Sequence, residues 1–116
     1  MVFIPKKNKY NAQSTNYGGY NYDSKKEASF AMNLDWKKKA GLIVRFERQC
    51  KLDLRVNGQH ICNYFIDFKV FLPDGSIEYI EVKGFETNVW RLKWAITKAI
   101  FNELTEGEDA RLVLEK

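Results

Sequence analysis

The sequence predicts an α/β fold with a restriction-endonuclease-like core, in which helices flank a mixed central sheet in the order α-β-β-β-α-β. Two observations predict it: three β-type stretches separate two helical stretches, and a short β-type stretch follows the second helix. The 116 residues, with 45% hydrophobic and 29% charged side chains, suit one globular domain. We place that domain at residues 23–116 and treat residues 1–22 as an N-terminal arm.

The arm is polar and shows no sustained period. It carries Lys6, Lys7 and Lys9, followed by tyrosines around a Gly-Gly pair. We expect it to be partly ordered at best in isolation, because the ends of a domain are rarely held without a docking partner. Its lysines are candidates for DNA contacts, whereas an unstructured start to the chain is the alternative.

The first helix is expected to begin after Ser24, an N-cap residue, and to end near Lys39 before Gly41. The second should run from Thr87 or Asn88 to about Leu104. Its apolar residues extend around much of its circumference, so we expect it to be largely buried.

The β-type stretches cover residues 42–46 and 50–56, which can form one bent strand, then about 61–72 and 77–83. The pair Asn57-Gly58 predicts a tight hairpin turn between the first two strands. A last strand is expected at 110–114.

The strands at 61–72 and 77–83 carry apolar residues at even positions and charged residues at odd ones. Asp67 lies on the first strand, and Glu81 and Lys83 lie on the second. Because strand side chains alternate between faces, we expect one face to form the core and the other to carry these three groups.

The turn between these strands, residues 73–76, sets their register. If Leu72 pairs with Ser76, Asp67 lies opposite Glu81, and opposed residues in an antiparallel pair are about 5 Å apart. Two carboxylates this close repel unless a divalent cation lies between them. The alternative is that both acids are solvated on the exposed face of a two-layer sheet, with Lys83 as a cross-strand partner.

Hydrolysis of a phosphodiester needs an activated water and neutralisation of charge at phosphorus. Mg²⁺ held by carboxylates supplies both, and a lysine beside it can position the water. Asp67, Glu81 and Lys83 match that need. Mn²⁺ is an alternative to Mg²⁺.

Glu27 permits two interpretations. Ser24 and Glu27 have the spacing of a capping box, in which the glutamate turns back to the cap. Glu27 also lies on the same helical stripe as Phe30, Ala31 and Leu34, where a buried carboxylate is costly unless something compensates it. The sequence leaves both interpretations open.

The segments 23–28, 66–68 and 81–85, in this element order, resemble the PD-(D/E)XK nuclease superfamily. The chain is most similar to small phage-encoded endonucleases of that superfamily, which are related to Holliday-junction resolvases. The resemblance covers about residues 20 to 105. Ile66 stands where the superfamily's proline would precede the aspartate, and that proline is not a metal ligand.

The resemblance implies that Asp67 and Glu81 bind Mg²⁺ with help from the backbone carbonyl of Val82. Lys83 would act on the water, and Glu27 would complete the acidic cluster. Gln49 occupies a position where such phage proteins often have a glutamine, and we include it in the candidate site.

Basic residues are expected around the cluster. Lys25 and Lys26 open the first helix, and Arg91 and Lys93 lie in the first turns of the second. In the proposed fold they would contact DNA phosphates, which gives salt-dependent binding without sequence preference. Solvent-facing lysines that only aid solubility are the alternative.

The predicted function is therefore a Mg²⁺-dependent DNA endonuclease, acting in DNA recombination as a homodimer that resolves four-way junctions. A two-fold dimer would supply the two symmetric cuts. The alternatives are a nuclease that nicks or cleaves ordinary single- or double-stranded DNA, and a non-catalytic DNA-binding protein with this fold. His60 is the one histidine, so a histidine-based zinc site is not expected. No apolar run reaches membrane-spanning length and no signal peptide is evident, so we expect a cytoplasmic, intracellular protein.

Overall fold

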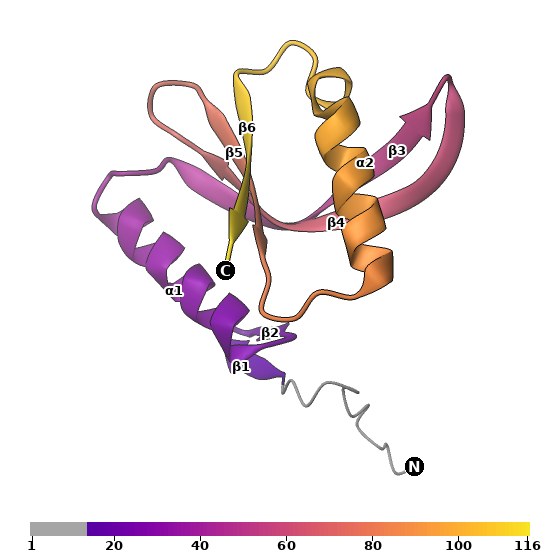
Figure 1. The fold of residues 1–116 in the computed structure, drawn as a ribbon. Coiled ribbons are helices and arrows are strands. Elements are labelled where there is room, and N and C mark those ends of the chain that lie inside the picture. The colour runs from indigo at the N-terminus through magenta and orange to yellow at the C-terminus, as the bar shows by residue number, and fades with distance from the viewer. Residues whose placement is uncertain (1–13) are drawn as a thin grey trace.

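The computed structural model describes residues 14–116, and this part of the chain has the predicted α/β fold (Figure 1). A four-stranded mixed sheet has the order β3-β4-β5-β6, and a separate two-stranded sheet pairs β1 with β2. Within the larger sheet, β6 runs parallel to β5 and the other neighbours are antiparallel. The elements are β1 (Thr15–Tyr17), β2 (Tyr20–Tyr22), α1 (Lys25–Lys39), β3 (Arg45–Val56), β4 (Gln59–Phe71), β5 (Ile77–Val82), α2 (Asn88–Leu104) and β6 (Ala110–Glu115).

Local sequence signals account for the ends of the elements. The Ser24 side chain accepts a hydrogen bond from the N–H of Glu27, and the Thr87 side chain accepts one from the N–H of Trp90, so both helices have the predicted N-caps. The turn at Asn57-Gly58 uses positive φ at both residues, 52° and 80°, as a tight hairpin with the right twist requires.

The sheet is covered on both faces. Neighbouring residues of β5, Tyr79 and Ile80, lie in different hydrophobic clusters, one under α2 and one under α1. The α1 cluster contains Leu34, and the α2 cluster contains Trp90 and Trp94. The molecule therefore has three layers, helix, sheet and helix, and on β5 the odd-numbered face lies under α2.

The even-numbered side chains of β4 do not share one face, contrary to the prediction from alternation. Ile66 lies in the α2 cluster, whereas Phe68 lies in the α1 cluster. In the pairing of β3 with β4, Gln49 and Asp67 are skipped between the pair that contains Phe68 and the pair that contains Ile66. Gln49 has φ 49°, a left-handed conformation that interrupts the two-residue alternation of a strand. The sheet thus changes face at the position of Asp67.

Two further expectations need correction. Part of the segment predicted to be an arm is folded: β1 and β2 form a hairpin, and Tyr22 is 1% exposed in the α1 cluster. Helix α2 is buried on one face only, because Val89 and Leu92 are 65% and 63% exposed. Neither helix of the described residues has the length and apolar run that a membrane crossing requires.

Candidate active site

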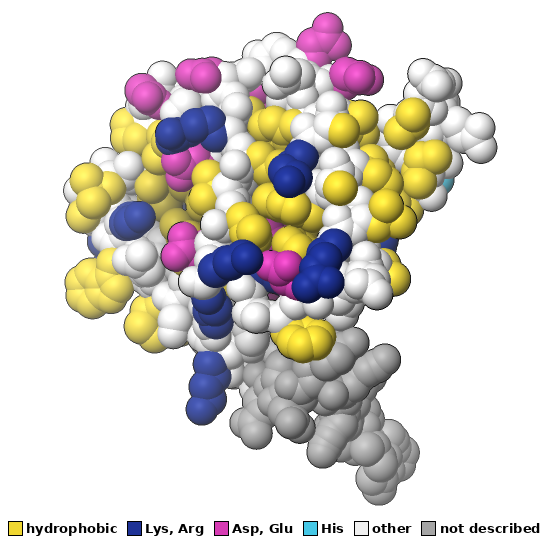
Figure 2. Space-filling model, viewed as in Figure 1, with side chains coloured by type: hydrophobic (Ala, Val, Ile, Leu, Met, Phe, Trp, Pro, Cys, Tyr) yellow, Lys and Arg dark blue, Asp and Glu magenta, His cyan; other side chains and the backbone are white. Residues whose placement is uncertain are grey.

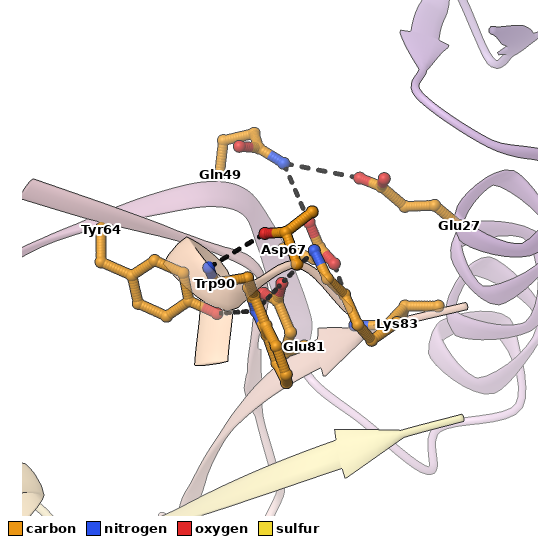
Figure 3. Close-up of polar contacts among 9 residues, drawn as sticks. Glu27, Gln49, Tyr64, Asp67, Glu81, Lys83 and Trp90 are labelled. Carbon is orange, nitrogen blue, oxygen red and sulfur yellow. Dashed lines mark hydrogen bonds and ion pairs between the residues drawn. The ribbon is translucent and has the colours of Figure 1, made fainter. Parts of the chain in front are cut away.

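Five side chains predicted for the site lie together where the N-terminal end of α1 meets the sheet (Figure 3). They come from four elements: Glu27 from α1, Gln49 from β3, Asp67 from β4, and Glu81 from β5 with Lys83 directly after it. The structure brings them together because β3 and β4 change face beside the end of β5.

Asp67 occupies a gap between two diverging strands. The Leu72 N–H donates to the Ser76 carbonyl, at 2.9 Å, which gives the predicted register, but the β4–β5 pairing ends at Phe68 and Ile80. Beyond that pair, the Val82 N–H donates to Asp67 Oδ2 at 2.9 Å. The Asp67 carboxylate thus accepts the hydrogen bond that a backbone carbonyl of β4 would accept in a regular ladder. The same bond directs the Asp67 carboxylate toward Glu81.

The Glu27 carboxylate is directed into the cluster. Its Oε2 lies 3.4 Å from Gln49 Nε2, and the same nitrogen lies 3.2 Å from Asp67 Oδ1. Gln49 therefore donates between two acids. Ser24 caps the helix by accepting the backbone N–H of Glu27 at 3.1 Å, whereas the Glu27 carboxylate is directed to Gln49 and not back to the cap as in a capping box.

Glu81 and Lys83 form the other half of the cluster. Lys83 Nζ lies 3.8 Å from Glu81 Oε2 and 5.0 Å from the centre of the Trp90 ring. Glu81 and Asp67 are 4% and 8% exposed. They are therefore not the solvated residues of an open sheet face that the alternative interpretation required.

Burial and mutual repulsion raise the pKa values of the carboxyl groups in the cluster. Burial, and then the charge of Asp67, raise the pKa of Glu27 from 4.5 to about 8 and that of Glu81 to about 7. Burial also raises the pKa of Asp67, although the bonds from Val82 and Gln49 oppose that shift. A bound cation would relieve these costs by favouring the charged forms.

The fit to a divalent cation depends on the free oxygens. As they stand, no three His, Cys, Asp or Glu side chains of residues 14–116 are grouped closely enough to hold a metal ion. Within the same residues, however, Glu81 Oε1 is buried and has no hydrogen-bond partner. An unpaired carboxylate oxygen in a protein interior is costly, and hard-cation coordination is one way to satisfy it. The donor set of carboxylate oxygens therefore fits Mg²⁺ or Mn²⁺, with Asp67 and Glu81 as the residues that would hold it.

The basic residues predicted to contact DNA lie near the starts of the two helices. Lys25 and Lys26 are exposed in the first turn of α1, and Arg91 and Lys93 lie in the first turns of α2. Figure 2 shows Lys and Arg side chains beside Asp and Glu side chains in the lower half of the visible face, over the region where β5 ends and α2 begins. The remaining candidates for DNA contacts, Lys6, Lys7 and Lys9, lie outside the described residues.

Sequence reasoning missed three residues near the acids. Trp90 Nε1 donates to Glu81 Oε2 at 3.1 Å and also lies 2.9 Å from the Tyr64 hydroxyl. Asp23 is close enough for its charge to raise the pKa of Glu27. The apolar pattern of β4 and α2 assigns Tyr64 and Trp90 to the core, and nothing in that pattern indicates that their polar atoms meet an acid.

The fold and the site define an α/β protein whose buried carboxylates meet a lysine at the end of a strand. The chain belongs to the family described as "Protein of unknown function (DUF1064)", whose model matches residues 7–111. No match to the chain was found among curated proteins or among solved structures.

Proposed function

We propose that this protein is a metal-dependent DNA endonuclease. The observation that carries the proposal is the convergence of Asp67, Glu81 and Lys83 at one buried spot, with an unpartnered oxygen on Glu81. A structural role alone gives no reason to bury two acids side by side, because their mutual repulsion raises both pKa values.

Each residue has a role that follows from its position. Asp67 and Glu81 would hold the cation, together with the Val82 carbonyl and with Glu27 at the far side of Gln49. When bound, Mg²⁺ or Mn²⁺ would neutralise the acids and supply Lewis-acid activation of the scissile phosphate. The Lys83 ammonium, beside Glu81, is suited to orient the attacking water and to offset phosphate charge.

The basic side chains near the acids are suited to contact the phosphates of a DNA backbone. Lys25, Lys26 and Arg91 are exposed at helix starts near the acids, where backbone N–H groups also favour anions. Net charge of +4 agrees with an anionic partner. The selectivity for four-way junctions comes from the superfamily resemblance, and the alternatives are a nuclease acting on linear DNA and a DNA-binding protein without activity.

A cleavage assay separates these functions. Purified protein is given a labelled four-way junction or a linear duplex of equal length, with Mg²⁺, with Mn²⁺ or with EDTA. We expect metal-dependent cutting that Asp67→Asn abolishes, and faster cutting of the junction. Equal rates on both substrates would favour the general nuclease. Retained DNA binding with no cutting under any metal would favour the non-catalytic protein.

The homodimer has a candidate surface on the outer face of α2. Val89, Leu92 and Ala99 are exposed there at intervals of three and seven residues, which places them on one face of the helix. In an antiparallel pair of α2 helices, Arg91 at the N-terminal end of one copy would face Glu103 near the C-terminal end of the other. A second copy packed on this face would remove the exposed apolar side chains of Val89 and Leu92 from water.

The dimer proposal is tested by light scattering after size-exclusion chromatography. Leu92→Glu should yield a monomer that retains the wild-type melting temperature. Leu42→Glu is the matched control, because Leu42 is 62% exposed but precedes β3. A monomeric wild type, or a dimer that survives Leu92→Glu, would contradict this interface.

A further inference from the structure

The two carboxylate oxygens of Glu81 have different surroundings. Oε2 accepts the indole N–H of Trp90 at 3.1 Å and lies 3.8 Å from Lys83 Nζ. Oε1 is buried and has no partner among residues 14–116. One oxygen of Glu81 is therefore held by the protein, and the other is left available to a ligand.

Tyr64 and Trp90 fix the position of Glu81 Oε2 through hydrogen bonds. Trp90 Nε1 lies 2.9 Å from the Tyr64 hydroxyl, and the Tyr64 side chain is itself hydrogen-bonded to Glu81. Both rings are buried, at 5% and 7% exposure, so water competes weakly for these bonds.

We infer that Tyr64 and Trp90 are positioning residues, which fix the Glu81 carboxylate so that Oε1 stays free to bind the divalent cation. Trp90 has a second duty, because Lys83 Nζ lies over its ring at 5.0 Å and is drawn there by the cation–π attraction. One side chain thus orients both a metal ligand and the candidate catalytic lysine. This inference rests on the proposed metal-dependent function, but metal binding alone can test it.

The chain supplies a matched control. Trp94 stacks on Trp90, with ring centres 5.5 Å apart and an angle of 17° between planes, and is 8% exposed. It belongs to the same helix and the same hydrophobic cluster, but it makes no polar contact with the acids in the described part of the chain. Trp94→Phe therefore causes a similar loss of packing without removing a donor to Glu81.

The experiment is calorimetric titration of the protein with Mn²⁺ alone, in Trp90→Phe, Tyr64→Phe and Trp94→Phe. Groups that orient metal ligands typically change affinity by about 10- to 100-fold when removed. We expect the first two variants to bind Mn²⁺ at least about 10-fold more weakly than wild type, and Trp94→Phe to bind as wild type does. Thermal unfolding of each protein without metal measures the loss of packing separately.

The possible results decide the matter as follows. Wild-type affinity in both Trp90→Phe and Tyr64→Phe would overturn the inference, as would an equal loss in Trp94→Phe. Tyr64→Phe removes only a hydroxyl, so it decides the question even if Trp90→Phe does not fold. Wild type that binds Mn²⁺ but cuts no DNA would refute the nuclease function and leave the positioning role intact. Wild type that binds no Mn²⁺ would overturn both.

Discussion

The stability of the metal-free protein should fall as pH rises from about 4.5 to about 8, and Glu27 should contribute most of the fall. Burial and Asp67 raise the pKa of Glu27 from 4.5 to about 8. A carboxyl with a raised pKa binds its proton more tightly in the folded protein than in the unfolded chain. Folding is therefore most favourable below pH 4.5, and stability is lost as pH rises through the interval between the two pKa values.

The size of this effect follows from the shift. Each pKa unit corresponds to about 1.4 kcal/mol, so the interval from 4.5 to about 8 represents on the order of 5 kcal/mol for Glu27. Glu81, whose pKa is raised to about 7, adds to the same trend. For a domain of this length, 1 kcal/mol shifts the melting temperature by roughly 4–8 °C, so the change is large enough to measure.

The assay is chemical denaturation in EDTA at a series of pH values, with wild type and Glu27→Gln. The variant keeps the side-chain shape and removes the charge, so its free energy of unfolding should depend much less on pH. Adding Mg²⁺ at pH 8 should restore stability to wild type by favouring the ionised acids. Parallel pH curves for the two proteins would refute the view that Glu27 is held in a costly buried position.

Three further outcomes are expected. Lys83→Ala should lower the cleavage rate at least about 100-fold with little change in DNA affinity, measured by single-turnover cleavage and filter binding; a rate near wild type would remove Lys83 from the mechanism. Ser24→Ala should cost about 1 kcal/mol of unfolding free energy in urea, through loss of the α1 cap, while cleavage persists. Lys25→Ala with Lys26→Ala should weaken DNA binding and make it less sensitive to salt, seen as a smaller slope of log affinity against log salt concentration; an unchanged slope would place both lysines away from the DNA.

Much of the fold could be predicted because local signals coincide with the ends of its elements. Ser24 and Thr87 mark the helix starts, Asn57-Gly58 marks the hairpin, and the β4–β5 turn sets the register that brings Asp67 beside Glu81. These are short-range effects of capping and turn geometry. The pairing itself ends at Phe68 and Ile80, so the bond from the Val82 N–H to Asp67 is also needed to hold the two acids together.

Tertiary effects account for what the sequence did not predict. The alternation of β4 implied one core face, but Ile66 and Phe68 lie in different clusters, on either side of the level where the pairing of β3 with β4 skips Gln49 and Asp67. The apolar residues around α2 predicted that the helix would be largely buried, but the rest of the chain packs against only one of its faces. The bond from Trp90 to Glu81 depends on where α2 packs against the sheet, which no local pattern encodes.

The backbone at Gln49 also has a cost of its own. Left-handed conformations are unfavourable for residues with a Cβ, by about 1 kcal/mol, and glycine adopts them freely. Gln49→Gly should therefore relax the main chain while deleting the amide that separates Glu27 from Asp67. The strained backbone of Gln49 places a neutral donor between two acids, so a substitution that relieves the strain would stabilise the chain and separate Glu27 from Asp67 less well.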